Sequence, residues 1–184
     1  MTITRKSIAP LFRNATCGLV AILAAAASVP SAFAAAALTT GSVSGLPIPR
    51  FVSLKADRVN VRAGPNRDQD VRWVYTRVGM PVEITAEFEN WRRIRDWEGA
   101  EGWVYHSLLS GKRTAVVVPK LNAELVPLYE NADVESAVTA KLQAGVVGAI
   151  KSCSGTWCHF TGKNFDGWIR QDRLWGAYPT EKVD

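Results

Sequence analysis

Histidine is scarce in this 184-residue chain, which contains only His106 and His159. With two histidines at unrelated positions, a pair of nucleophile and general base is hard to assemble. The sequence also lacks a glycine-rich loop for phosphate, a helical metal-binding motif and a pair of carboxylates in an evident cleft. These absences predict a protein that is not an enzyme and that has neither a cofactor nor a resident metal.

The apolar run near the start of the chain is short. Residues 19–29 are apolar apart from Ser28, and as a helix they would span about 16 Å, against roughly 30 Å for the hydrocarbon core of a membrane. Residues 1–18 carry three basic side chains and no acidic one, and Ala32-Phe33-Ala34 places small residues where a signal peptidase cuts. We therefore expect a signal peptide over residues 1–34 and a periplasmic or secreted protein, with an uncleaved membrane anchor as the disfavoured alternative.

A strong excess of one charge is missing as well. The whole chain has 22 Lys and Arg against 17 Asp and Glu, a net charge of +5. Three of the basic residues belong to the expected signal peptide, so 19 basic residues face the same 17 acidic ones after cleavage. A net charge of about +2 gives no reason to expect nucleic acid as a partner. Removal of the signal peptide would also leave no segment that binds a membrane.

Cysteine is limited to three residues, and Cys17 falls within the expected signal peptide. The other two, Cys153 and Cys158, flank Ser-Gly-Thr-Trp. In an exported protein an even number of cysteines favours a disulfide, and a bridge that closes so short a loop contributes about 2 kcal/mol. A metal site made by these cysteines and His159 is the weaker alternative, because structural zinc normally takes four ligands.

What the sequence does contain is an internal repeat. A shift of 66 residues places Gly79 on Gly145 and Trp91 on Trp157. After one deletion, a shift of 65 places Gly102-Trp103-Val104 on Gly167-Trp168-Ile169 and Leu109 on Leu174. Matches in the same order indicate two copies of one folding unit of roughly 60 residues, a size that can fold alone.

Each unit has the pattern of a β protein. Short alternating runs such as Val59-Asn60-Val61 and Val82-Glu83-Ile84 are separated by turn signals, and no run is long enough for an amphipathic helix. We therefore predict an all-β chain of two tandem small barrels, in which closure of each sheet protects its edges. The predicted segments are a signal peptide at 1–34, a flexible linker at 35–50, the first barrel at 51–111, the second at 112–176 and a tail at 177–184.

Further residues of the first unit resemble a known family. They are Val59-Asn60-Val61-Arg62-Ala63-Gly64-Pro65, Gly79, and Gly102-Trp103-Val104 with Leu108-Leu109. Together they resemble the bacterial SH3 domain family, and residues 87–99 are similar to an exported, tandem-repeat subgroup. The resemblance covers residues 51 to 176 and implies SH3-like barrels that serve as noncatalytic modules for cell-wall peptidoglycan or protein partners. The second unit departs from it, since Leu128-Tyr129-Glu130-Asn131 falls where the first has Arg62-Ala63-Gly64-Pro65.

Candidate ligand-binding residues lie in the first unit. Tryptophans present in both copies, Trp91 with Trp157 and Trp103 with Trp168, are expected to pack the barrels. Trp73, which falls on Thr139, and Trp97 have no aromatic counterpart. If residues 91–97 form a strand, alternation places on one face Trp91, Arg93, Arg95 and Trp97, and on the other Arg92, Ile94 and Asp96. Because Ile94 matches Phe160, its face is expected to point inward.

The opposite face would then present two guanidinium groups between two indoles, an arrangement suited to carboxylates and to the faces of sugars or peptides. We predict a ligand-binding surface formed by Trp91, Arg93, Arg95, Trp97 and Trp73. This prediction conflicts with the packing role given to Trp91. A solvated ladder of Arg and Trp that supports the sheet or packs on the second barrel is the alternative.

The counterparts of Cys153 and Cys158 at the shift of 66 are Glu87 and Arg92. A cysteine pair in one copy and an acid with a base in the other suggest that these two positions face each other across a hairpin.

Two functions of different classes fit these features. The first is a noncatalytic exported module that binds cell-wall peptidoglycan or its peptides, and the expected location outside the cytoplasm favours it. The alternative is a periplasmic adaptor that docks a protein partner through the same Trp and Arg surface, because these residue types also dominate protein interfaces.

Overall fold

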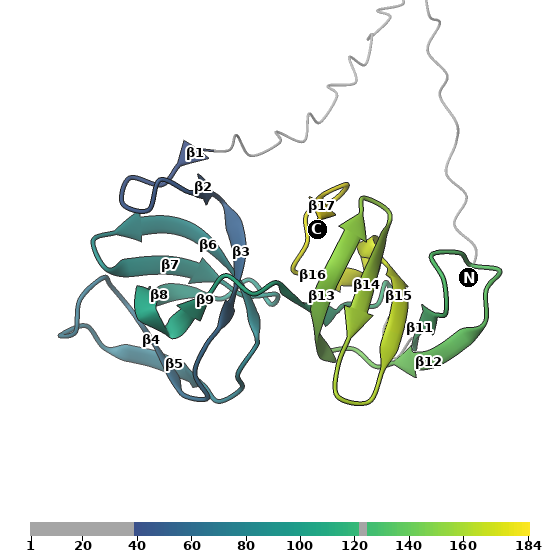
Figure 1. The fold of residues 1–184 in the computed structure, drawn as a ribbon. Helices are drawn as coiled ribbons and strands as arrows, with labels where there is room; N and C mark the ends of the chain where they lie inside the picture. Colours follow the sequence, from purple (N-terminus) through teal and green to yellow (C-terminus); the bar gives the residue numbers. More distant parts are fainter. Residues whose placement is uncertain (1–38, 122–124) are drawn as a thin grey trace, which may run out of the picture. The chain divides into compact units, whose positions relative to one another are not determined.

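Figure 1 shows the computed structural model of the chain, which describes residues 39–121 and 125–184. The predicted signal peptide at 1–34 lies outside the described residues. Over the described ranges the chain consists of β-strands, two short 3-10 turns and connecting loops, which confirms the predicted all-β class. No helix within these ranges is long and apolar enough to cross a membrane.

The first repeat is a seven-stranded sheet in the order β5-β4-β8-β7-β6-β3-β9 (Figure 1). All of its neighbouring strands pair antiparallel. Alternate residues face the core, as expected for a sheet with one buried face. Its elements are β3 (Arg50–Leu54), β4 (Val59–Arg62), β5 (Val71–Tyr75), β6 (Pro81–Phe88), β7 (Trp91–Arg95), β8 (Glu101–Tyr105), η1 (His106–Leu108) and β9 (Leu109–Ser110).

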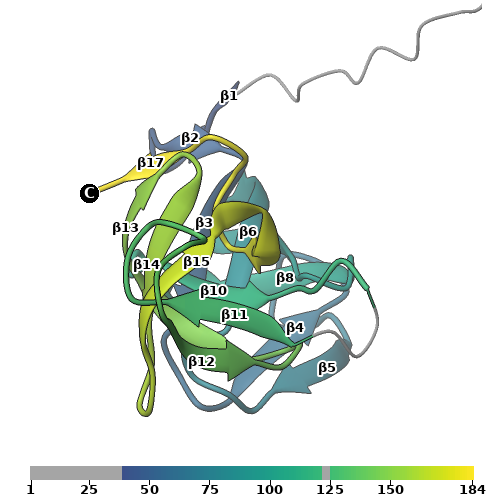
Figure 2. The same cartoon turned by 90° about the vertical axis from the view of Figure 1, so that its right-hand side faces the viewer.

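The second repeat has the same strand order, β12-β11-β15-β14-β13-β10-β16. A further strand, β17, pairs with β13 beyond this set, and the two views of Figures 1 and 2 show it beside β13. The matching order confirms the tandem repeat. The elements are β10 (Thr114–Val117), β11 (Val126–Tyr129), β12 (Val138–Leu142), β13 (Val147–Ser154), β14 (Trp157–Thr161), β15 (Asp166–Arg170), η2 (Gln171–Arg173), β16 (Leu174–Trp175) and β17 (Lys182–Val183).

The predicted barrels are not closed. Each sheet is an open path that ends at β5 and β9 in the first repeat and at β12 and β16 in the second. The strands β9 and β16 have two residues each and pair with β3 and β10. Such short strands leave the hydrogen-bonded ladder open at this edge of each sheet.

The strand positions also correct the predicted alignment of the early strands. Val61 pairs with Trp73 in the first repeat as Leu128 pairs with Ala140 in the second. The shift there is 67, so the counterpart of Trp73 is Ala140 rather than Thr139. The loop between β12 and β13 is one residue shorter than that between β5 and β6, and the shift becomes 66 only after it.

One glycine of each repeat has a backbone conformation that explains its repetition. Gly79 and Gly145 have φ of 77° and 78°, a region that only glycine enters without strain. Their N–H groups donate to the carbonyls of Leu54 and Val117, the last residues of β3 and β10. The two glycines therefore make the same turn ahead of β6 and β13.

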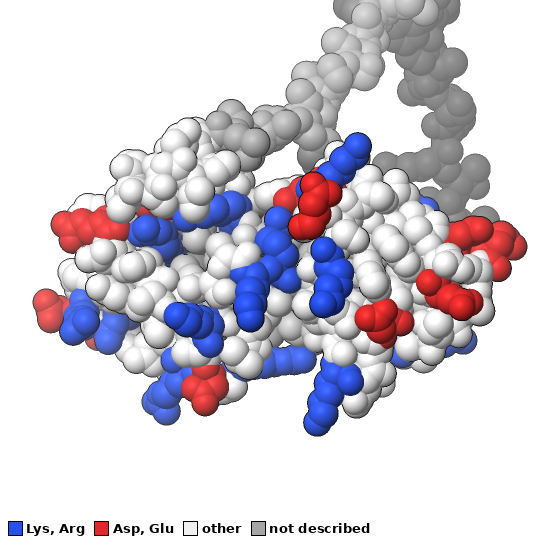
Figure 3. All heavy atoms as spheres, in the orientation of Figure 1, with Lys and Arg blue, Asp and Glu red and all other residues white. Residues whose placement is uncertain are grey.

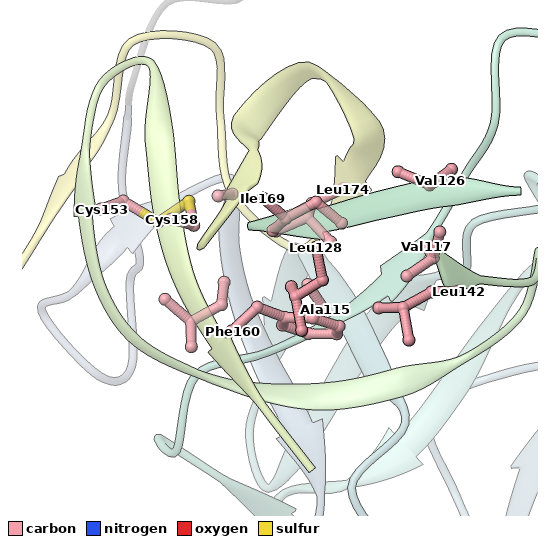
Figure 4. Packing of buried hydrophobic residues seen from close by; sticks show 12 residues of the cluster. Ala115, Val117, Val126, Leu128, Leu142, Cys153, Cys158, Phe160, Ile169 and Leu174 are labelled. Carbon is pink, nitrogen blue, oxygen red and sulfur yellow. A yellow bond between two sulfur atoms is a disulfide. The ribbon is translucent and has the colours of Figure 1, made fainter. Parts of the chain in front are cut away.

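Each repeat has its own hydrophobic core. In the first, fully buried side chains include Leu54, Val61 and Ile94. In the second, Phe160 and Leu128 lie at the centre, with the sulfur atoms of Cys153 and Cys158 at one side (Figure 4). Independent cores agree with the prediction of two folding units.

Residues 39–48 differ from the predicted flexible linker. The strands β1 (Thr39–Thr40) and β2 (Pro47–Ile48) form a small hairpin ahead of the first repeat. The carboxylate of Glu87 accepts hydrogen bonds from the backbone N–H groups of Val43 and Ser44, at 3.1 and 2.9 Å, and from the Ser44 hydroxyl at 2.6 Å. Glu87 thus holds residues 43 and 44 in place, although the segment 39–48 has no apolar periodicity.

Candidate binding surfaces

The strand that carries the predicted binding residues ends at Arg95, before Trp97. The cause is Asp96, whose Oδ1 accepts hydrogen bonds from the N–H groups of Glu98 and Ala100 at 3.0 and 2.8 Å. This side chain closes a turn, as aspartate commonly does. Asp96 is itself held by Tyr75, whose hydroxyl donates to its other carboxylate oxygen at 2.7 Å.

Burial and this hydrogen bond to Asp96 raise the pKa of the Tyr75 hydroxyl. Tyr75 therefore stays a proton donor, and the turn is preserved. Because the turn begins at Asp96, Trp97 lies in it instead of continuing the strand.

The structure does not bring the five predicted residues to one surface. Trp91 is 8% exposed and makes an edge contact with Tyr105, with ring centroids 5.5 Å apart. Trp73 packs against the first core. Arg93 and Arg95 are exposed, whereas Ile94 between them is fully buried, as the alternation predicts. The packing role predicted for Trp91 is confirmed.

Each of the two exposed arginines has an acidic partner. Arg93 pairs with Glu101, and Arg95 donates through Nε to Glu83 Oε2 at 2.9 Å. Glu83 is buried, so Arg95 supplies the charge that a buried carboxylate requires. Arg93 and Arg95 therefore pair with different acids, and Arg95 also lines a groove between the two repeats.

This groove, which we call the inter-repeat groove, has a volume of about 640 Å³ and receives side chains from both repeats. Its aromatic part is formed by Phe51, Trp175 and Tyr178: the Phe51 ring lies 4.9 Å from Trp175, edge to face, and 4.6 Å from Tyr178. The volume falls within the range of small-molecule and short-peptide sites. The lining includes Phe51, Glu83, Arg95, Arg170, Gln171, Asp172, Leu174, Trp175, Ala177, Tyr178, Pro179 and Thr180.

One wall of the groove is tied together by Tyr178. Its hydroxyl donates to Glu83 Oε1 at 2.8 Å, while Arg95 holds the other oxygen of the same carboxylate. Burial and the bond to Glu83 raise the pKa of Tyr178, which keeps the hydroxyl protonated as the donor. The segment predicted only as a tail therefore supplies a wall residue that bonds to the first repeat.

The same segment is anchored to the second repeat. Glu181 accepts from Arg113 at 2.8 and 3.0 Å, and its Oε2 accepts from the N–H of Tyr178. Burial alone would raise the pKa of Glu181, but the hydrogen bonds from Arg113 and Tyr178 lower it. Gln171 donates to the carbonyls of Tyr178 and Glu181. These contacts fix the position of Tyr178 in the groove.

On the second-repeat side, the groove is bordered by charge that faces solvent. The Arg170 guanidinium lies 5.6 Å from the centre of the Trp157 ring, and its side chain is 45% exposed. Asp172 lies between Lys120, at 2.7 Å, and Arg170, at 3.8 Å. The hydrogen bond from Lys120 lowers the pKa of Asp172 against the effect of burial, so this carboxylate is ionised.

The sequence analysis missed the aromatic residues of the groove. Phe51 and Thr114 occupy the same register position, opposite Glu83 and Ala149 respectively, and Trp175 corresponds to Ser110 at the shift of 65. Phe51 and Trp175 therefore have no aromatic counterpart in the other repeat. Trp73 and Trp97 were identified as aromatic residues without an aromatic counterpart in the other repeat. Phe51 and Trp175, at the ends of the repeats, meet the same criterion.

The shared tryptophans divide into two kinds. Trp91 and Trp157 are 8% and 9% exposed and pack as predicted. Trp103 and Trp168 are half-buried and point to the outer side of β8 and β15, since their neighbours along each strand are the buried ones. Both are only partly buried, so the predicted packing role holds less fully for this pair than for Trp91 and Trp157.

The hairpin prediction for the cysteines is confirmed. Cys153 and Cys158 are cross-strand neighbours joined by a disulfide. Glu87 and Arg92 are cross-strand neighbours at the equivalent place, with 3.3 Å between Oε1 and Nε. Within residues 39–121 and 125–184, no three His, Cys, Asp or Glu side chains gather in a way that could hold a metal ion.

Comparison with known proteins gives one family and several distant structures. A model of the bacterial SH3 domain matches the chain twice, at residues 55–111 and 122–176. No curated protein matches. Two solved structures, NlpC2 and NlpC1 from Trichomonas vaginalis, are similar at 13% identity and a TM-score of 0.32 each. The matches cover 69% and 73% of this chain and 48% of each of those proteins, so the chain spans about half their length.

Proposed function

We propose a noncatalytic binding function for this chain from one premise: the chain belongs to the bacterial SH3 domain family, whose model matches both of its repeats. Domains of this family are bacterial binding modules. The proposed ligand is cell-wall peptidoglycan or the peptides of that polymer, and the proposed location is the periplasm or the outside of the cell.

The inter-repeat groove is the observation that supports this ligand best. Its aromatic part can cover the apolar side chains of a short peptide. Arg95 and Arg170 lie among its lining residues, one from each repeat, with side chains 48% and 45% exposed. Guanidinium groups pair with carboxylates through two parallel hydrogen bonds. Because Arg95 already pairs with Glu83 and Arg170 lies 3.8 Å from Asp172, a carboxylate of the peptide would use the remaining N–H donors of these two guanidinium groups.

Cosedimentation with isolated peptidoglycan tests the proposal. We expect the purified protein to sediment with the polymer, and Arg95→Ala and Arg170→Ala each to lower the bound fraction. Arg58→Ala serves as the matched control, because Arg58 is an exposed arginine that does not line the groove.

Two arginine variants are needed because they differ in their structural cost. Arg95→Ala leaves the buried Glu83 with fewer partners and can destabilise the fold. Arg170 lies 3.8 Å from Asp172, an acid with other cationic neighbours, so its removal is structurally milder. Thermal unfolding of each variant separates the two effects.

Binding that is equal in wild type and both variants would exclude the groove as the site. A wild-type protein that stays in the supernatant would refute wall binding and leave the periplasmic adaptor as the function to pursue.

A further inference from the structure

The outward-facing tryptophans, Trp103 and Trp168, have matching surroundings in the two repeats. On the strand next to each one, the residue directly opposite is a base: Arg93 faces Trp103, and His159 faces Trp168. Arg93 and His159 occupy equivalent positions of β7 and β14. The sequences of the two repeats differ at most other outward positions, so this shared placement requires an explanation.

An acidic residue completes each group. Arg93 pairs with Glu101, and His159 Nε2 lies 2.8 Å from Asp166 Oδ1. Glu101 and Asp166 are each the first residue of β8 and β15, two positions before the tryptophan. We call these two groups the tryptophan faces: Trp103 with Arg93 and Glu101, and Trp168 with His159 and Asp166.

Packing in a core does not by itself account for the tryptophan faces, because each indole is only partly buried and keeps some contact with solvent. Trp103 borders a hollow of about 320 Å³ that Arg93 and Glu101 also line. Trp168 borders a hollow of about 330 Å³ on another side, where Cys153 and Val183 lie and which neither His159 nor Asp166 lines. A partly buried indole beside a hollow that its neighbouring base and acid also line, as at Trp103, is an arrangement for contact with a ligand.

The charge of each face limits the chemistry of that ligand. A base and an acid lie together, so an anion would be opposed by the carboxylate and a cation by the guanidinium or imidazolium. The pair offers donors and acceptors side by side next to an apolar ring face. A sugar fits these groups because it is a neutral ring. Its C–H groups can stack on the indole, and the hydroxyls at its edge can bond to the base and the acid.

We propose that Trp103 and Trp168 are two related saccharide-binding sites, each of which takes one neutral sugar ring of a glycan chain. These sites are separate from the inter-repeat groove and do not depend on the peptide ligand proposed for it. Two sites on one chain bind a repeating polymer more tightly than either site binds a single unit, because the second contact is intramolecular.

The two sites differ in strength. The His159 ring is stacked on Trp168, with centroids 5.1 Å apart and planes 16° from parallel, so part of this indole is already covered. Arg93 shows no such stacking on Trp103 among the described contacts. We therefore expect the Trp103 site to contribute more than the Trp168 site.

Nuclear magnetic resonance of the purified protein tests this proposal with two neutral probes, chitotetraose and cellotetraose. We expect the indole N–H signals of Trp103 and Trp168 to shift with at least one probe, and those of the buried Trp91 and Trp157 to stay in place. Trp→Phe variants assign the signals. Trp103→Ala should weaken binding about tenfold, as loss of an interface tryptophan commonly does, and Trp168→Ala by less.

Further variants distinguish a sugar site from a folding effect. Glu101→Gln keeps the indole and removes a charged acceptor, so it should weaken saccharide binding while thermal unfolding stays near that of wild type. Arg58→Ala, at an exposed arginine outside the groove and both hollows, should leave saccharide binding unchanged.

The proposal would be overturned if neither probe shifts the two outer indoles, or if the Trp103→Ala, Trp168→Ala double variant binds as wild type does. Shifts of the same indoles by a soluble wall peptide but by neither sugar would also overturn it. None of these results depends on whether the groove binds peptidoglycan.

Discussion

Replacement of Glu87 by glutamine should remove a pH-dependent part of the stability of the first repeat. The carboxylate accepts hydrogen bonds from Ser44 and Val43 and also pairs with Arg50 at 2.8 Å and with Arg92 at 3.3 Å. Burial alone would raise its pKa, but the hydrogen bonds, led by those from Ser44, lower it from 4.5 to about 2. At about 1.4 kcal/mol for each tenfold change, this difference corresponds to about 3 kcal/mol.

The sign of the pH effect follows from the lowered pKa. Because the folded protein holds the ionised form, the stabilisation is fully present above the pKa of the unfolded chain, near 4.5, and is lost as the pH falls through about 2. The Glu87→Gln variant never has this contribution. It should therefore be less stable than wild type by up to about 3 kcal/mol at pH 7, and the difference should shrink as the pH falls from 4.5 to 2.

Urea denaturation at a series of pH values measures this difference. Glu89→Gln is the matched control, because Glu89 is an exposed acid two residues further along the same hairpin. If the gap between wild type and Glu87→Gln stays constant from pH 5 to pH 2, the loss does not come from ionisation of Glu87, and the argument fails.

Three further perturbations have expected outcomes. Replacement of Cys153 and Cys158 by serine should lower the unfolding free energy by about 2 kcal/mol, the value for so short a loop, and a loss under about 0.5 kcal/mol in urea denaturation would contradict it. Trp91→Ala should cost about 3 kcal/mol or more as a core truncation, whereas Trp103→Ala should cost less because Trp103 is only partly buried; equal losses would show that Trp103 packs as fully as Trp91. Gly79→Ala should cost about 1 kcal/mol because of its positive φ, and chemical denaturation that detects no change would refute this reading of the turn.

Local patterns were sufficient to predict the class and the repeat. Alternation identified the strands, and the repeated glycine at 79 and 145 marks a turn that a side chain would strain. Cys153 and Cys158 match Glu87 and Arg92 of the first repeat. Because a disulfide and an ion pair each require two side chains close together, these two positions were predicted to face each other. These inferences depend on neighbours along one hairpin, and for this reason they could be made without the structure.

Features that depend on distant residues could not be predicted in this way. The strand after Trp91 was extended too far because alternation alone does not show that Asp96 will close a turn through its side chain. The hairpin at 39–48 is held by Glu87, which lies at least 39 residues further along the chain. No pattern within residues 39–48 predicts this contact. The inter-repeat groove combines Phe51 from one end of the domain pair with Tyr178 from the other, so it required both the alignment and the tertiary fold.

The equivalent hairpins of the two repeats are closed by different bonds, and this gives the halves of the molecule different chemical weaknesses. Acid protonates Glu87 and loosens the first hairpin, but it does not affect the covalent link between Cys153 and Cys158. A thiol reductant opens that link and leaves the ion pair intact. Acid alone or a thiol reductant alone therefore weakens the closure of one repeat and leaves that of the other in place.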